Sequence, residues 1–289
     1  MKNHSAAELI LNPDGSIYHL HLHPGDIAED IILVGDPERV DMISSKFEKV
    51  EIIKKHREFR THTGFYQGKR ISVISTGIGT DNIDIVLNEL DALVNINLNS
   101  GEPYKKITGL NFFRIGTTGG MQGDIPLNSF IVSRIAIGFD GVLNFYHNRD
   151  LVCDLRAEKE FKSFVSWNRL LPSPYFISSS ENLFERLNDN IISGMTISAP
   201  GFYGPQGRSL RLKSLDPLLN KKINSFRYNE MRITNYEMES SALFGLSSLL
   251  GHEAITICAM IANRITGEIT TDYKPVMDKL ITFTLNHIC

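Results

Sequence analysis

Cysteines and long apolar runs are scarce in this sequence, and each scarcity excludes a class of protein. The 289 residues include only three cysteines, which are widely spaced and form no C-x-x-C pair: Cys153, Cys258 and Cys289. Such spacing supports neither a disulfide framework nor a zinc site and is typical of a reducing compartment. The most apolar stretch, residues 254–262, is too short to span a membrane. We therefore predict a cytoplasmic protein with no membrane partner.

Positive charge is not in excess either. The chain has 30 Lys and Arg against 33 Asp and Glu, which gives a formal net charge of -3. This balance does not favour nucleic acid as a partner, although a local group of cations could still bind a small anion.

The glycine motifs of the common nucleotide-binding folds are incomplete. Gly77 and Gly79 would need a third glycine at position 82, which is Asn82, to form a dinucleotide-binding turn. Residues 64–70 resemble a phosphate loop but are one residue short and lack its Ser or Thr. We therefore expect neither a bound dinucleotide nor a nucleoside triphosphate.

Strand-like and helix-like segments alternate along nearly the whole chain. We expect strands at residues 30–34, 58–66, 70–75, 111–115, 129–137, 194–199, 232–238 and 254–261, and helices at 37–47, 82–94, 158–171, 181–187, 239–250 and from 276. This order predicts a single α/β domain over residues 1–289, whose central mixed sheet is mostly parallel and has helices on both faces. Residues 95–111 are expected to form an extra loop. Ligands of such sheets bind beyond the carboxyl ends of the strands.

Residues 111–120 are the stretch most suggestive of a ligand site. An apolar segment carries one cation, Arg114, directly into glycines at 116, 119 and 120. A strand that ends in a glycine-rich turn lets backbone N–H groups approach an anion, and a guanidinium adds forked donors suited to phosphate. The alternative is an ordinary strand end whose arginine pairs with a carboxylate.

Three further groups of polar residues admit two interpretations each. His19, His21 and His23 alternate, so a strand would point all three to one side as metal ligands, although a polar edge with one functional histidine is the simpler reading. Glu237 and Glu239 lie between apolar segments, where each carboxylate needs an arginine or the hydroxyl groups of a ligand. Residues 202–208 are either an exposed loop or a wall of a pocket that recognises a planar heterocycle.

Taken together, eight segments resemble the nucleoside phosphorylase superfamily, in particular its uridine-cleaving branch. They occur in the family's order over nearly the whole chain: residues 18–20, 35–39, 56–59, 75–79, 114–119, 202–208, 235–240 and 263–264. The resemblance implies an α/β nucleoside phosphorylase fold and a pentosyltransferase activity, in which a nucleoside and inorganic phosphate give a free base and a pentose 1-phosphate.

The resemblance also implies a role for each matching residue. The phosphate would be bound by Gly35, Arg39, Arg57, Arg114 and Thr117. The ribose would be bound by His19, Met238 and Glu239. The base would be bound by Thr118, Gly119, Phe202, Gln206, Arg208, Glu237 and Arg264. The residues expected to act on the reacting atoms are Arg39, Arg114, Arg208 and Glu239. In the family, the residues matching His19 and Arg57 come from a neighbouring subunit, which implies a homo-oligomer, either a dimer or a hexamer.

The same resemblance bears on cofactors and on the choice of base. No cofactor is implied, because inorganic phosphate is a co-substrate. Relatives can hold a potassium ion near the positions of Glu58 and Ile78, but Asn82 replaces the usual hydroxyl residue there. Purine-cleaving relatives have an aspartate where this chain has Asn263, so a pyrimidine substrate, uridine, is expected. The alternatives are a broader nucleoside phosphorylase, a nucleosidase, and a nucleoside-binding protein without catalysis.

Overall fold

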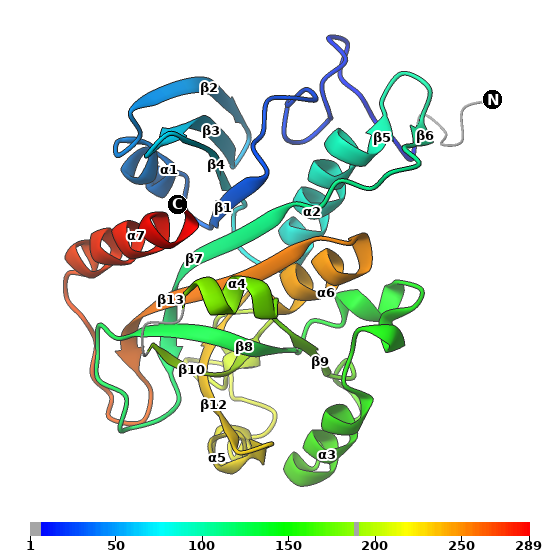
Figure 1. Ribbon diagram of the computed structural model, residues 1–289. Helices are drawn as coiled ribbons and strands as arrows, with labels where there is room; N and C mark the ends of the chain where they lie inside the picture. Colours follow the sequence, from blue (N-terminus) through cyan, green and yellow to red (C-terminus); the bar gives the residue numbers. More distant parts are fainter. Residues whose placement is uncertain (1–6, 188–190) are drawn as a thin grey trace.

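One mixed sheet of eleven strands forms the centre of the molecule (Figure 1). The computed structural model describes residues 7–187 and 191–289. The strands of the sheet are β1 (Asp30–Val34), β2 (Lys49–His56), β3 (Phe59–Tyr66), β4 (Lys69–Ser75), β7 (Asn111–Gly120), β8 (Phe130–Gly138), β9 (Tyr175–Ser178), β10 (Ile192–Ser198), β11 (Arg227–Tyr228), β12 (Met231–Glu237) and β13 (Glu253–Asn263). Their spatial order is β11-β12-β10-β8-β13-β7-β1-β4-β3-β2, with β9 paired to β8.

The parallel pairs lie in the middle of this order. β1 runs parallel to both β4 and β7, β7 parallel to β13, and β10 parallel to both β8 and β12. The expected hairpin of β3 and β4 is antiparallel, as is the pair β2 and β3 at the same margin. The predicted α/β fold with a mixed central sheet is confirmed.

Helices cover both faces of the sheet because the central strands are apolar on both sides. They are α1 (Pro37–Ser44), α2 (Thr80–Asn95), α3 (Leu155–Val165), α4 (Glu181–Arg186), α5 (Leu219–Ser225), α6 (Ser240–Leu250) and α7 (Lys274–Ile288). Along β1, Ile31 and Leu33 pack in a core with α2 and α6, whereas Ile32 and Val34 pack in another core with α1, α4 and α7. This alternation follows from the two-residue period of a strand and explains why β1 has no polar face.

The glycines after Arg114 correct the sequence interpretation. They do not form a turn, because β7 continues through Gly120 and pairs with β12 as well as with β13. A Cβ atom on Gly116 would lie 2.3 Å from the Arg114 guanidinium, and one on Gly120 would lie 2.2 Å from Met260 Sδ. These glycines therefore permit close packing around an extended strand, which sequence alone does not distinguish from a chain reversal.

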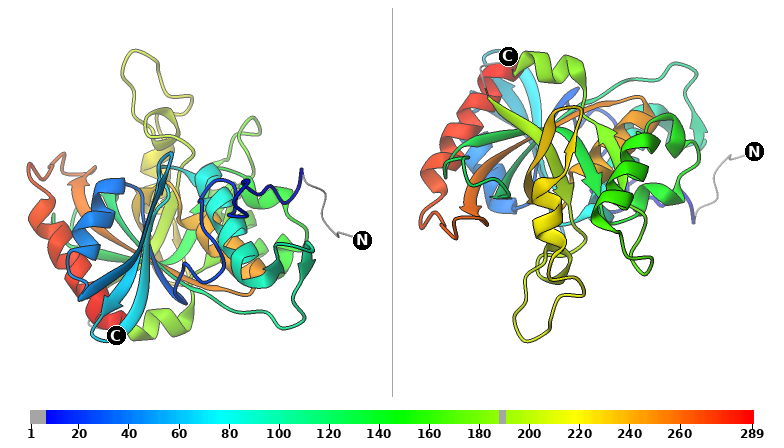
Figure 2. Two further views of the ribbon diagram at one scale, coloured as in Figure 1. Left: turned by 90° about the horizontal axis from the view of Figure 1, so that it is seen from above. Right: turned by 90° about the horizontal axis from the view of Figure 1, so that it is seen from below.

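Several smaller elements were not expected from the sequence. The strands β2, β9 and β11 and the helix α5 were missed, and the extra segment of residues 95–111 contains a small sheet of β5 (Ile96–Asn97) and β6 (Glu102–Pro103). The loop between residue 206 and α5 protrudes from the body of the molecule (Figure 2) and exposes Leu210, Leu212 and Leu215. In the described part of the chain, no helix has the length and apolarity needed to cross a membrane.

Candidate active site

A cleft of about 1110 Å³ opens beyond the carboxyl ends of β1, β4, β7 and β12. It gathers all of the site residues expected from the sequence except two, His19 and Arg57. Its lining includes Gly35, Arg39, Arg114, Thr117, Thr118, Gly119, Phe202, Gln206, Arg208, Glu237, Met238, Glu239 and Arg264. Segments distant in sequence thus meet at the edge of the sheet where ligands of such folds bind.

The start of α1 forms part of the cleft lining. Asp36 caps this helix by accepting a hydrogen bond from the Glu38 N–H at 2.9 Å, and Pro37 occupies its first turn. The helix therefore begins at Pro37, two residues after Gly35, and places Arg39 in its first turn. Arg39 and Thr117 of β7 line the same cleft. No described residue accepts a hydrogen bond from the Arg39 guanidinium, so its donors are available to an anion.

Arg114 lies deeper and is the charge partner of two buried glutamates. It is 5% exposed, and one of its Nη atoms donates to Glu239 Oε2. Its other Nη lies 3.5 Å from Glu237 Oε2 and 3.7 Å from Cys258 Sγ. Burial by itself would lower the pKa of Arg114, but Glu239 and Glu237 outweigh burial and raise this pKa above its ordinary value. The guanidinium is therefore charged at every relevant pH.

Arg114 pairs with a carboxylate, as in the simpler interpretation of its segment. It also lines the cleft, as does Thr117, so it is placed where a ligand could reach it. A guanidinium has five N–H donors, and its Nε atom has no hydrogen-bond partner in the described chain, so donors remain for a ligand.

Glu239 lines the cleft and is held by two backbone N–H groups as well as by Arg114. Its Oε1 accepts from the Gly79 N–H at 2.8 Å, and its Oε2 accepts from the Met238 N–H at 3.2 Å. Burial raises the pKa of Glu239, Arg114 opposes that rise and Glu237 adds to it. Gly79 adopts a φ of 98°, which favours glycine, and this conformation turns its N–H toward the carboxylate. Sequence reasoning gave Gly79 no role, because its contact comes from a residue 160 positions away.

Glu237 is occupied mainly by protein donors. Its carboxylate accepts from Ser198 Oγ at 2.5 Å and from the N–H groups of Glu239 and Ser240 at 2.9 and 3.0 Å. These two N–H groups belong to the start of α6, where a carboxylate is favourable. Glu237 thus fixes the start of the helix that presents Glu239.

Another part of the cleft lining is a group of three side chains, Gln206, Arg208 and Arg264. The buried Oε1 atom of Gln206 accepts from Arg208 at 2.5 Å and from Arg264 at 3.2 Å. Arg208 also stacks on the Phe202 ring, with its Cζ atom 3.8 Å from the ring centroid. Burial and the charge of Arg264 lower the pKa of Arg208. Both lone pairs of Oε1 are used, and no described residue accepts a hydrogen bond from Nε2, so the Nε2 donors are available to a ligand.

Thr118 and Asn263 line the cleft but use their polar atoms within the protein. The Thr118 hydroxyl donates to the Tyr236 carbonyl at 2.5 Å and accepts from Asn235 Nδ2 at 2.7 Å. Asn263 Nδ2 donates to the carbonyls of Gln122 and Ile125 at 3.0 and 3.2 Å, while its Oδ1 accepts from N–H groups of residues 265 and 266. The loop-holding role of Asn263 was not visible in the sequence.

The histidine pattern of residues 19–23 does not produce a common face. The segment turns instead of forming a strand, because His21 adopts a left-handed φ of 57°. His19 Nδ1 lies 2.6 Å from Glu89 Oε1, and His21 stacks on His56. Arg57 is exposed and lies over the Tyr18 ring. His19 and Arg57 are therefore near each other but outside the cleft of their own chain.

The residues at the expected potassium position do lie together at the rim of the cleft. Asn82 Nδ2 donates to Glu58 Oε1 at 3.4 Å, and both residues line the cleft with Ile78. This arrangement turns an N–H donor toward the carboxylate where a cation needs another oxygen ligand. Among the described residues, no cluster of three or more His, Cys, Asp or Glu could hold a metal ion.

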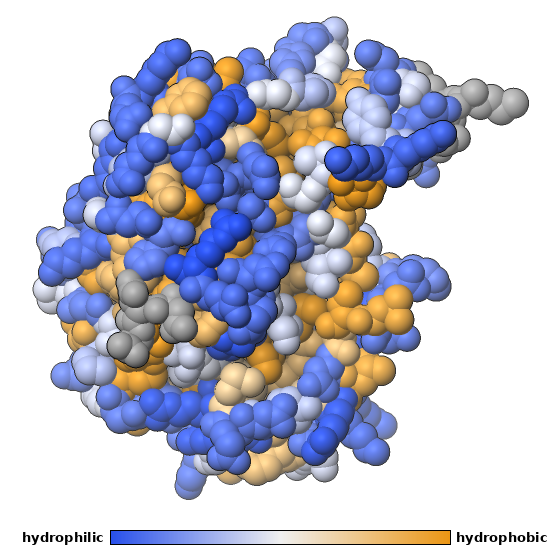
Figure 3. Space-filling view, in the orientation of Figure 1, coloured by the Kyte–Doolittle hydropathy of each residue, from blue (hydrophilic) through white to orange (hydrophobic). Residues whose placement is uncertain are grey.

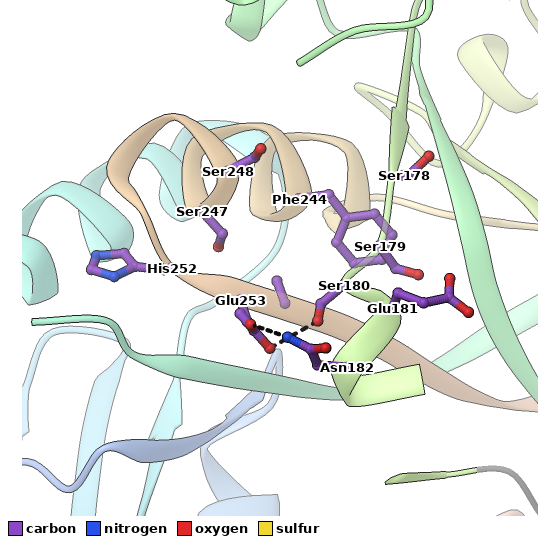
Figure 4. A pocket seen from close by; sticks show the side chains of 11 residues that line it. Ser178, Ser179, Ser180, Glu181, Asn182, Phe244, Ser247, Ser248, His252 and Glu253 are labelled. Carbon is purple, nitrogen blue, oxygen red and sulfur yellow. Dashed lines mark hydrogen bonds between the residues drawn. The ribbon is translucent and has the colours of Figure 1, made fainter. Parts of the chain in front are cut away.

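A second, smaller cleft of about 250 Å³ lies at the amino end of β13 (Figure 4). It is lined mainly by serines and by two carboxylates, and neither Lys nor Arg is among the described residues that line it. Figure 4 shows Ser180 and Asn182 directed at Glu253, which accepts from them at 2.9 and 2.7 Å. The buried hydroxyl groups of Ser179 and Ser247 have no hydrogen-bond partner in the described part of the chain, but no described Lys or Arg of this lining offers a fixed positive charge to phosphate. The arginine-lined cleft is therefore the candidate active site.

Comparisons with known proteins agree with this geometry. Residues 29–285 match the family model described as the phosphorylase superfamily. The chain is 34% identical over 269 residues to the uridine phosphorylase of Thermococcus kodakarensis, covering 91% of this chain and 83% of that protein. It is 29% identical to a DeoD-type purine nucleoside phosphorylase of Alkaliphilus metalliredigens, covering 88% of this chain and 90% of that protein.

A solved structure shares the fold over almost its full length. The crystal structure of a Trypanosoma brucei nucleoside phosphorylase that shows uridine phosphorylase activity superposes with a TM-score of 0.84 and 28% identity, covering 97% of this chain and 99% of that chain. The relatives thus include enzymes named for uridine and for purine nucleosides. The relatives named here are nucleoside phosphorylases, and the chain itself belongs to the phosphorylase superfamily, a family of enzymes.

Proposed function

We propose that the chain catalyses the phosphorolysis of uridine by inorganic phosphate, giving uracil and ribose 1-phosphate in pyrimidine salvage. The observation that carries the proposal is the composition of the cleft. Arg39 with free donors, the Gln206 group with further donors, and the Glu239 carboxylate line the same cleft. The uridine phosphorylases among its relatives support the same assignment.

The proposed reaction needs opposite charges stabilised at two places. Breaking the glycosidic bond builds positive charge on the sugar and negative charge on the departing base. Phosphate held by Arg39 and Arg114, with Thr117 and the Gly35 backbone, supplies the negative charge next to the sugar. The Glu239 carboxylate accepts hydrogen bonds from the ribose hydroxyl groups, with Met238 against the ring. No separate general base is required, because phosphate is already an anion, and no cofactor or cation enters the proposal.

In this proposal, the uracil base binds in the part of the cleft around Gln206. Uracil has two carbonyl acceptors, and Gln206 Nε2 and Arg208 supply N–H donors for them. Positive charge on Arg208 and Arg264 stabilises the charge left on the ring after cleavage. Phe202, stacked by Arg208, provides an apolar surface for the base. A Cβ atom on Gly119 would lie 3.4 Å from Arg264 Cδ, so the glycine leaves room for the Arg264 side chain.

The proposal includes a cytoplasmic homo-oligomer, a dimer or a hexamer, with shared active sites. Its support is the position of His19 and Arg57 outside the cleft of their own chain. Figure 3 shows hydrophobic side chains gathered along the right-hand side of the molecule, where Figure 1 has α2, α6 and the loop before α3. Phe145 and Leu151 in that loop are 91% and 78% exposed, as expected of a surface that another copy covers.

The test is uracil release from uridine by the purified protein, measured with and without inorganic phosphate. Deoxyuridine, thymidine and inosine are assayed in parallel. We expect release that depends on phosphate and is at least about 100-fold faster with uridine than with inosine, since unmatched buried polar groups discriminate strongly. Release without phosphate would identify a nucleosidase, comparable cleavage of inosine a broader phosphorylase, and binding without release a non-catalytic protein.

A further inference from the structure

We propose that Glu89 is a positioning residue that holds the imidazole of His19 for the 5′-hydroxyl of a nucleoside bound in another copy of this chain. The inference deepens the proposed function, on which it rests. It assigns a role to a helix residue that lies outside the cleft and touches no part of the expected substrate.

Both carboxylate oxygens of Glu89 bind residues of one turn, His19 and Leu20. Its Oε1 accepts from the His19 N–H at 3.0 Å and lies 2.6 Å from His19 Nδ1. Its Oε2 accepts from the Leu20 N–H at 2.9 Å and from the His19 N–H at 3.1 Å. The side chain of Glu89 is 13% exposed, so these contacts are partly shielded from water. One carboxylate thereby fixes both the backbone and the ring of His19.

The contact at Nδ1 determines which nitrogen of His19 is available. A carboxylate only accepts, so the proton of this bond lies on Nδ1. No described residue contacts Nε2 through a hydrogen bond, and the side chain is 25% exposed. His19 therefore presents Nε2 outward in a fixed direction, as an oriented contact to a hydroxyl group requires.

Neighbouring side chains connect the His19–Glu89 pair to Arg57, the other residue that the proposal places in a partner's cleft. His56 Nδ1 donates to the His19 carbonyl at 2.8 Å, and the Tyr18 ring lies edge-on to the imidazole with centroids 4.8 Å apart. Arg57 lies over the same Tyr18 ring at 5.5 Å. The phosphate-binding Arg57 and the sugar-binding His19 thus belong to one cluster, which Glu89 attaches to α2.

A purely structural role for Glu89, in which it only holds the turn, makes a different kinetic prediction. Loss of a structural role would lower kcat/KM for all substrates alike, whereas loss of His19 positioning would lower kcat/KM only for substrates that have a 5′-hydroxyl. The decisive comparison is kcat/KM for uridine against 5′-deoxyuridine in the unmodified protein, Glu89→Gln and His19→Ala. Asp91→Asn is the matched control, because Asp91 is on the same helix and lies 3.2 Å from another histidine, His252.

We expect Glu89→Gln to lower kcat/KM for uridine about tenfold, mainly through KM, and to leave 5′-deoxyuridine nearly unchanged. His19→Ala should give the same pattern, and combining the two changes should add little. Asp91→Asn should keep the ratio of the unmodified protein. Equal losses on both substrates in Glu89→Gln, or an unchanged ratio, would overturn the inference.

A second measurement does not depend on activity. In ¹⁵N-histidine spectra of the unmodified protein, we expect the His19 signals of a ring with Nδ1 protonated, and loss of that signature in Glu89→Gln. An unaltered His19 signal in the variant would contradict the role of Glu89. If the unmodified protein does not cleave uridine, the proposed function fails, whereas normal cleavage with an unaffected 5′-hydroxyl preference removes only the role of Glu89.

Discussion

Removing the Arg114 guanidinium should destabilise the protein as well as abolish its activity. Arg114, Glu237 and Glu239 are 5%, 4% and 4% exposed, so Arg114→Ala leaves two buried carboxylates without their cation. Glu237 keeps three protein donors, but Glu239 keeps only two backbone N–H groups. Breaking a buried ion pair from one side costs about 3–5 kcal/mol. This corresponds to a fall in Tm of roughly 6–20 °C.

The loss should depend on pH in a defined direction. Burial raises the pKa of Glu239 while Arg114 holds it down, so the variant has a still higher pKa at this carboxyl. A carboxyl with a folded-state pKa above its unfolded value stabilises the fold below the unfolded value and loses that contribution as pH rises through the folded pKa. The Tm deficit of Arg114→Ala should therefore be larger at pH 8 than at pH 5.

The assay is thermal unfolding at both pH values, together with phosphorolysis at pH 7. Arg156→Ala, which removes an exposed arginine paired with Glu160, is the control and should not change Tm measurably. The double variant Arg114→Met with Glu239→Gln should recover much of the lost stability without recovering activity, since no buried charge is left between that pair. A Tm equal to that of the unmodified protein at pH 8, or a deficit that grows as pH falls, would refute the reasoning.

Three further substitutions test other parts of the cleft. Arg39→Met should raise the phosphate KM about 10- to 100-fold without lowering Tm, because the guanidinium binds no described residue; an unchanged phosphate KM would place phosphate elsewhere. Asn263→Asp should lower Tm and give no inosine cleavage, since a carboxylate cannot donate to the carbonyls of Gln122 and Ile125; new purine activity in this variant would contradict that view. Gln206→Glu should retain the acceptor for the arginines but lose the Nε2 donor, lowering kcat/KM for uridine at least about tenfold with little change in Tm; equal kcat/KM would show that the amide does not contact the base.

The main elements of the fold could be predicted because their periodicity is local. β1 is apolar at every position after Asp30, and Asp36 followed by Pro37 marks the start of α1 in the sequence itself. The continuation of β7 through its glycines could not be predicted, because it depends on pairing with β12, more than 100 residues further along the chain. The same limit applies to β9, whose pairing partner β8 is also distant in sequence.

The candidate site divides in the same way. Arg114 and Gln206 were expected at a site because of their own segments, and Arg39 because of the family resemblance; the structure brings all three into one cleft. The two contacts that orient Glu239, from Gly79 and from Arg114, were not specified by any segment alone. Glu237 was expected at the base, whereas its hydrogen bonds to the start of α6 follow from a tertiary arrangement that its neighbours in sequence do not reveal.

Helix α2 has contacts at two points that would serve different active sites in the proposed oligomer. The Gly79 N–H just before its first residue binds Glu239 of its own chain, and Glu89, ten residues later, holds His19 for a neighbouring copy. Ten helical residues span about 15 Å, and a helix of this length moves nearly as a rigid body. In the proposed oligomer, one helix therefore carries a contact of its own cleft near its start and a contact for the neighbouring cleft near its middle. A substitution that shifts the start of α2 is expected to alter both sites.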